Sequence, residues 1–193
     1  MTFVAVVLAA GAGTRFGGGK LSALLHGEPL VRHAIRAARA APVDRVVVVC
    51  SPDLAIGEWT GSPPVETLRV ASDALSVSLK AGIAAAGAAE GAFVFLGDMP
   101  LVPHDVADRL AMALDDRFAA VPRQAGRNGH PVLLSRRAFP EIAGLSGDEG
   151  AGKLLKARGD IAFVECASDT IHLDIDRRED LARIELPEPP AAS

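Results

Sequence analysis

The chain alternates short, continuously apolar runs with Ala-rich stretches that have helical periodicity. The apolar runs of the first half are FVAVVLA at 3–9, RVVVVC at 45–50 and AFVFLGD at 92–98. The helical stretches between and after them are 30–41, 76–89 and 103–116. Strands that are apolar throughout are buried on both faces, which is typical of a parallel sheet covered by helices. The pattern predicts an α/β fold with three layers, α/β/α, around a mostly parallel sheet.

The second half of the chain has a different pattern. Four further strands are predicted, at 118–122, 130–135, 161–166 and 170–175, with shorter helical segments between them. We expect this half to add an antiparallel or edge portion that builds a substrate site. Ser76 and Pro103 mark helix starts. Because there is no internal linker, residues 1–185 are expected to form one domain and 186–193 a flexible C-terminal tail.

Composition and charge narrow the class of protein. The 193 residues, 49% of them hydrophobic, are enough for one core. A net charge of -4 without a Lys/Arg run argues against a nucleic-acid partner and favours small-molecule substrates. Cys50 and Cys166 lack a CxxC spacing, so both are expected to be free thiols. The apolar start has no basic region before it, and no run is long enough to span a membrane, so we expect a cytoplasmic protein.

The loop after the first predicted strand, LAAGAGTRFGGGK at 8–20, holds five glycines and two cations. It fails the dinucleotide fingerprint at Phe16, and it fails the Walker pattern at Thr14 and Leu21. Its backbone N–H groups can still wrap a triphosphate while Arg15 and Lys20 neutralise the charge. The alternative is a glycine-rich surface turn with two solvated cations.

Carboxylates follow two other predicted strands, where ligands of open α/β sheets collect. Asp98 ends the most apolar strand and suits Mg²⁺, or it is a turn aspartate bonded to nearby N–H groups. Asp174 and Asp176 share one side if the strand at 170–175 continues, so either can be a second magnesium ligand. For Asp176, a helix cap is the alternative.

The loop at 123–130 also precedes a predicted strand. It can meet an anionic substrate, or it can be a mobile hairpin. The five histidines lack metal-ligand spacing, which argues against zinc. Of these, only His130 lies in a candidate substrate loop, and we expect core or surface roles for His33, His104 and His172.

Five motifs in order give the chain a family resemblance: LAAGAGTRFGGGK, ALSVSLKAG, GDMPLV, GHPVLL and DIDRREDL. With them, the chain resembles nucleotidyltransferases of the glycosyltransferase-A-like fold, most specifically the molybdenum cofactor cytidylyltransferases. The resemblance covers nearly the whole chain and implies a Rossmann-like sheet of the nucleotidyltransferase type.

The resemblance implies a role for each matching residue. Arg15 and Lys20 would hold the triphosphate and, with Asp98, carry the catalysis. Asp98 would bind Mg²⁺, and Asp176 would be a second metal ligand. The nucleotide site would also include Leu8, Ala9, Ala10, Gly11, Gly13, Thr14, Ser76 and Ser78. The acceptor would meet Asn128, His130 and Asp148.

The resemblance also bears on the substrates. Alanine at Ala10 is typical of the cytidylyl branch, where the guanylyl branch has glycine, so CTP is favoured by about 1 to 3 kcal/mol at most. Because of two departures from the family motifs, the resemblance determines the identity of the acceptor less closely than that of the nucleotide. Gly152 stands where the family has arginine, with Lys153 one place later, and the family's DTPED is DRRED here, with Arg177 and Arg178 after Asp176.

The implied reaction is in-line transfer of CMP from CTP to the phosphate of molybdenum-loaded molybdopterin, with release of pyrophosphate. A molybdenum enzyme or its maturation factor is the protein partner that this role suggests. The alternatives are a guanylyl or sugar/polyol-phosphate nucleotidyltransferase, an NAD(P)H-dependent pigment reductase like nicotine-blue oxidoreductase, and a non-catalytic nucleotide-binding module. The failed dinucleotide fingerprint does not support the reductase.

Overall fold

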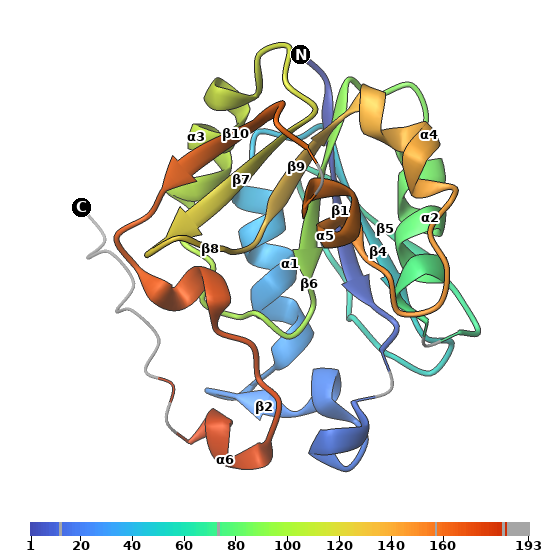
Figure 1. The fold of residues 1–193 in the computed structure, drawn as a ribbon. Coiled ribbons are helices and arrows are strands. Elements are labelled where there is room, and N and C mark those ends of the chain that lie inside the picture. Colours follow the sequence, from blue (N-terminus) through green and yellow to red (C-terminus); the bar gives the residue numbers. More distant parts are fainter. Residues whose placement is uncertain (12, 73, 157, 183, 185–193) are drawn as a thin grey trace.

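The computed structural model describes residues 1–11, 13–72, 74–156, 158–182 and 184. Eight strands form one mixed sheet in the order β10-β7-β9-β6-β1-β4-β5, with β8 paired to β7 (Figure 1). Helices α1 (Leu30–Ala40) and α3 (Asp105–Leu114) pack on one face. Helices α2 (Leu75–Ala86), α4 (Phe139–Ile142) and α5 (Ala151–Lys156) pack on the other. The predicted three-layer α/β/α fold is confirmed.

The centre of the sheet is parallel, as its apolar strands indicate. Strand β1 (Phe3–Ala9) lies between β4 (Arg45–Cys50) and β6 (Gly91–Leu96), and β5 (Val65–Arg69) forms the edge beyond β4. Alternate β1 residues enter two cores, with Val7 on the α1 side and Val6 on the α2 side. A Cβ on Gly82 would lie 2.3 Å from Cγ1 of Val6, so this glycine lets α2 approach the sheet closely.

The second half builds the expected antiparallel portion. Strand β9 (Val132–Ser135) runs antiparallel to both β6 and β7 (Ala119–Gln124). Strand β10 (Ile161–Glu165) pairs in parallel with β7, and β8 (Arg127–Asn128) folds back on the end of β7. Helix α6 (Arg178–Leu181) follows near the end of the described chain. The predicted tail at 186–193 lies outside the described residues.

The strand predicted at 170–175 is wrong. Residues Asp169–His172 form a 3-10 turn, η4, which begins where the Ser168 hydroxyl accepts a hydrogen bond from the Thr170 N–H at 3.2 Å. Ile171 and Ile175 are both fully buried in the core on the α1 side, so the turn buries the same apolar positions that a strand would bury. The Ser168 cap, which the apolar pattern does not show, goes with the turn.

Two smaller differences concern element boundaries. Helix α2 begins at Leu75, so Ser76 lies in its first turn and does not cap it. Strand β5 and the hairpin of β2 (Leu24–Leu25) and β3 (Glu28–Pro29) were not predicted, because these strands are short or partly exposed and lack a long apolar run.

Two expectations about the whole chain can be compared with the structure. Cys50 and Cys166 are free, the first buried and the second half-buried. Among the helices in the described ranges, none combines the length and apolar character that crossing a bilayer requires.

Candidate active site

Three segments meet at the carboxyl edge of the central strands: the loop after β1, the turn after β6 and the segment before α6 (Figure 1). The loop contains two short 3-10 turns, η1 (Thr14–Phe16) and η2 (Lys20–Ser22). Gly13 has φ +58°, and a Cβ there would lie 2.9 Å from Cβ of Lys20. The glycine therefore lets the loop close on itself and turn Arg15 and Lys20 toward the carboxylates.

Lys20 is the centre of the ionic contacts at this edge. Its Nζ lies 2.7 Å from Oδ2 of Asp98 and 3.3 Å from Oδ1 of Asp176, and its side chain is only 12% exposed. Burial by itself lowers the pKa of Lys20, but hydrogen bonds and attraction from the two carboxylates outweigh it and hold the pKa above its ordinary value. Lys20 is therefore a cation throughout the physiological range.

Asp176 also pairs with Arg15, whose Nη1 lies 3.2 Å from Oδ2 of the carboxylate. Burial opposes ionisation of Asp176, but Lys20 and Arg15 together lower its pKa. The N-cap residue of α6 is Arg177 and not Asp176, and Asp180 in the first turn accepts at Oδ2 from the N–H groups of Asp176 at 3.1 Å and Arg177 at 2.7 Å. The Asp176 side chain is thus available to the site.

Asp98, Asp174 and Asp176 each offer an oxygen, and the three oxygens lie within 4.8 Å of one another. The backbone holds them together, because the Ile175 N–H donates to the Asp98 carbonyl at 3.0 Å. Burial and the charges of Asp176 and Asp98 raise the pKa of Asp174. Crowded carboxylate oxygens with an excess of negative charge fit a hard divalent cation such as Mg²⁺ or Mn²⁺. The sequence left Asp174 and Asp176 as alternatives for a second metal ligand, and in the structure both belong to the cluster with Asp98.

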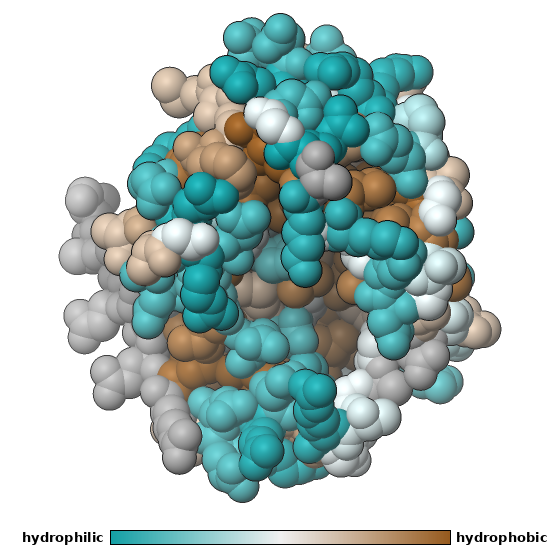
Figure 2. Space-filling model, viewed as in Figure 1, coloured by the Kyte–Doolittle hydropathy of each residue, from teal (hydrophilic) through white to brown (hydrophobic). Residues whose placement is uncertain are grey.

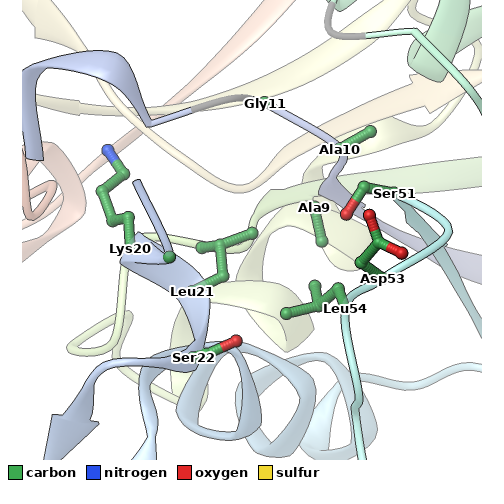
Figure 3. Close-up of a pocket in the computed structure, with 10 residues that line it drawn as sticks. Ala9, Ala10, Gly11, Lys20, Leu21, Ser22, Ser51, Asp53 and Leu54 are labelled. Carbon is green, nitrogen blue, oxygen red and sulfur yellow. The ribbon is translucent and has the colours of Figure 1, made fainter. Parts of the chain in front are cut away.

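Two hollows adjoin the loop after β1. One, of about 340 Å³, is lined by Ala9, Ala10, Gly11, Gly19, Lys20, Leu21, Ser22, Ser51, Asp53 and Leu54. Figure 3 shows Ser51 and Asp53 beside Ala10, with Leu54 next on the same segment and Leu21 on the facing loop. The other, of about 270 Å³, is lined by Leu8, Gly11, Gly13, Lys20, Leu21, Leu75, Leu96 and Asp98. These hollows bring together most residues expected to bind the nucleotide.

Sequence reasoning missed Ser51, Asp53 and Leu54 in this site. They directly follow β4, and the rule that ligands collect at strand ends could have found them. Thr14 lines a neighbouring hollow with Arg15 and Lys20, of about 230 Å³.

The expected serines are less accessible than the sequence suggested. Ser76 and Ser78 are only 2% and 3% exposed, and α2 contributes Leu75 to the wall of the second hollow. The Ser76 N–H donates to the Gly147 carbonyl at 3.1 Å, which joins the loop before α5 to the start of α2. That loop carries Asp148, which is exposed.

A further hollow, of about 200 Å³, adjoins the acidic cluster at Asp174. It is lined by Leu96, Met99, Arg127, Asn128, Gly129, His130, Ile171, His172 and Asp174. Asn128 and His130 therefore lie together as expected, whereas Asp148 is not among the lining residues. Burial lowers the pKa of His130.

His172, for which a core or surface role was expected, lies in the wall of this hollow. His33 has the expected core role, with its Nε2 bonded to the Leu25 carbonyl at 3.1 Å.

The DRRED departure adds positive charge beside Arg15. Arg15, Phe16, Arg177, Arg178 and Glu179 line a hollow of about 400 Å³. The Arg178 guanidinium lies 4.9 Å from the centre of the Phe16 ring. In the space-filling view, this lower part of the molecule is largely hydrophilic, and apolar side chains line the hollowed centre above it (Figure 2). The arrangement favours an anion next to the acidic cluster.

The chain is similar in sequence and in fold to known nucleotidyltransferases and related proteins. The family model described as MobA-like NTP transferase domain matches residues 5–162. The purine catabolism protein PucB of Bacillus subtilis (strain 168) is 34% identical over 166 residues, 80% of each chain. A probable molybdenum cofactor guanylyltransferase of Thermococcus gammatolerans is 34% identical over 145 residues, 72% of each chain. The crystal structure of Rv0371c from Mycobacterium tuberculosis in complex with manganese superposes with a TM-score of 0.77 at 25% identity, covering 95% of this chain and 97% of that one.

Proposed function

Since the chain belongs to the MobA-like NTP transferase domain family, we propose that it transfers CMP from CTP to the phosphate of molybdenum-loaded molybdopterin, releasing pyrophosphate. One observation carries the proposal: a glycine loop with two cations faces three clustered carboxylates at the end of a parallel sheet. That arrangement suits a nucleoside triphosphate and a divalent cation together.

The acidic cluster would hold Mg²⁺ through Asp98 and Asp176, with Asp174 as a further oxygen ligand. When bound, Mg²⁺ supplies positive charge at the phosphate oxygens. The manganese complex of Rv0371c supports a divalent cation in a related fold. Lys20 now neutralises two of these carboxylates, so metal binding would leave its ammonium group to the triphosphate.

The remaining work of the protein is positioning and charge neutralisation. Two anions, the donor triphosphate and the acceptor phosphate, must approach each other for in-line displacement at the α-phosphorus. Lys20 and Arg15 would reduce their repulsion, and the loop N–H groups would orient the triphosphate. Of two hollows that reach the acidic cluster, one contains Asp98 in its wall and the other Asp174, so donor and acceptor would have separate places beside it.

GTP is the second candidate donor, because the related Thermococcus protein carries the name guanylyltransferase. Ala10 favours CTP: it is 5% exposed and lines the hollow in which a base would lie, so its methyl group narrows that space. We therefore place CTP first and GTP second.

The proposal predicts acceptor-dependent pyrophosphate release with Mg²⁺ and molybdenum-loaded molybdopterin, fastest with CTP among CTP, GTP and ATP. A reaction without acceptor is the control. Faster release with GTP would reverse the choice of donor. Absence of release with every nucleotide would reject the transferase proposal with this acceptor.

Ala10→Gly is expected to shift the donor preference toward GTP by about tenfold, because one methyl group is worth roughly 1 to 3 kcal/mol of discrimination in a binding pocket. The measurement is the ratio of kcat/KM for CTP and GTP in both proteins. Ala88→Gly, at an exposed position after α2, is the matched control and should leave the ratio unchanged. An unchanged ratio in Ala10→Gly would remove Ala10 from base selection.

A further inference from the structure

The hollow beside Asp174 contains buried polar atoms that have no partner. Within the described residues, three buried side-chain nitrogen or oxygen atoms lack a hydrogen bond: Nε of Arg45, Nδ1 of His130 and Nε2 of His172. The two histidines line the same hollow. A buried polar group without a partner is costly, so folded proteins rarely keep one without a reason. Two of them in one hollow point to a ligand that supplies the missing bonds.

The backbone holds the two rings in place. The His130 N–H donates to the Ile171 carbonyl at 2.9 Å, and the Gly129 N–H donates to the Pro122 carbonyl at 2.8 Å. A Cβ on Gly129 would lie 2.6 Å from the Ile171 oxygen, so the two segments are in close contact. The His130 ring passes near the Val94 backbone, but its Nδ1 finds no partner in hydrogen-bond geometry there. The backbone of the two segments is therefore held together, and one buried nitrogen of each ring has no partner.

The other walls of the hollow limit what can bind. Leu96 and Met99 are apolar, and Asp174 places a carboxylate at the side of the acidic cluster. The cation of the hollow, Arg127, is on an exposed hairpin. A phosphate group would meet a carboxylate without a buried cation to offset it. The volume of about 200 Å³ is below the range of roughly 300 to 1,000 Å³ typical of whole-ligand pockets, so it fits one ring system.

We propose that this hollow binds a neutral, flat, hydrogen-bonding ring of the acceptor, with Nδ1 of His130 and Nε2 of His172 pairing with its edge. An imidazole nitrogen either donates or accepts, according to the tautomer, which suits a heterocycle that presents N–H and C=O groups side by side. The inference rests on the proposed function, in which the acceptor phosphate lies toward Asp174 and the acidic cluster. His172 thereby becomes an acceptor-binding residue.

The kinetic test uses His130→Phe and His172→Phe, which keep a flat ring but remove the hydrogen bonds. Each is expected to raise the KM for molybdenum-loaded molybdopterin about five- to tenfold, the effect of losing one such bond, while the KM for CTP stays within twofold. His104→Phe, at an exposed position before α3, is the control. An unchanged acceptor KM in both histidine variants would overturn the inference.

A binding test separates this inference from the proposed function. 6-Hydroxymethylpterin, a neutral pterin without phosphate, is titrated against the whole chain while its fluorescence is followed, with inorganic phosphate as competitor. We expect binding that weakens at least about fivefold in each variant and that phosphate does not displace. Equal binding by all variants, displacement by phosphate or no binding by the wild type would overturn the inference. Histidine-dependent binding without pyrophosphate release would retain the pterin site and reject the transferase reaction.

Discussion

Lys20→Ala is expected to lower kcat/KM for the nucleoside triphosphate by at least about a hundredfold. At an effective dielectric constant near 20, two unit charges about 4 Å apart interact by about 4 kcal/mol. Each 1.36 kcal/mol corresponds to a factor of ten, so losing this cation is worth two to three powers of ten when it neutralises the triphosphate in the transition state. The measurement is steady-state pyrophosphate release with the acceptor at saturation.

The effect must be distinguished from loss of folding. Lys20 is buried against Asp98 and Asp176, and its removal leaves these carboxylates without their shared partner, so we also expect a lower Tm. Circular dichroism should still show a cooperative transition, because the ion pairs lie at the edge of the sheet and outside its apolar cores. Lys156→Ala, at the exposed end of α5, is the control. Near-normal turnover of a folded Lys20→Ala protein would mean that Lys20 does not neutralise the triphosphate.

Asp98→Asn and Asp98→Ala are each expected to lose at least about a hundredfold in kcat/KM. Asp98 is placed by the end of β6, and its carbonyl accepts the Ile175 N–H at 3.0 Å, so its carboxylate has a defined position in the acidic cluster. An amide of the same shape keeps that geometry but removes the negative charge that Mg²⁺ requires. The loss in Asp98→Asn therefore reports the charge itself.

Metal binding can be measured without turnover. Adding millimolar Mg²⁺ or Mn²⁺ to chelator-treated protein is expected to raise the Tm, since a cation that binds the folded state stabilises it. The rise should be lost in Asp98→Asn and kept in Asp108→Asn, which changes an exposed residue of α3. If Asp98→Asn keeps both the metal-dependent rise and normal kcat/KM, Asp98 is not the metal ligand.

Much of the fold could be predicted because burial on both faces leaves a local pattern. Strands β1, β4 and β6 and helices α1 to α3 were located to within a few residues from their apolar runs and helical spacing. The strand at 170–175 was wrong because Ile171, Leu173 and Ile175 alternate with polar residues, a pattern that a strand shares with a turn and extended segment packed on one core. An alternating pattern records which residues are apolar but not where the chain turns.

The sequence by itself determined the layered α/β class, the family and the strand ends at which chemistry collects, because each depends on residues close together in the chain. Only the tertiary structure decided which of those ends meet. Asp98 joins Asp174 and Asp176 through a backbone hydrogen bond between distant segments, and Lys20 reaches across from the loop after β1. His172 lines the same hollow as His130 because η4 packs against residues 129–130, where the His130 N–H donates to the Ile171 carbonyl. Such contacts depend on long-range packing and hydrogen bonds, for which one segment of sequence carries no signal.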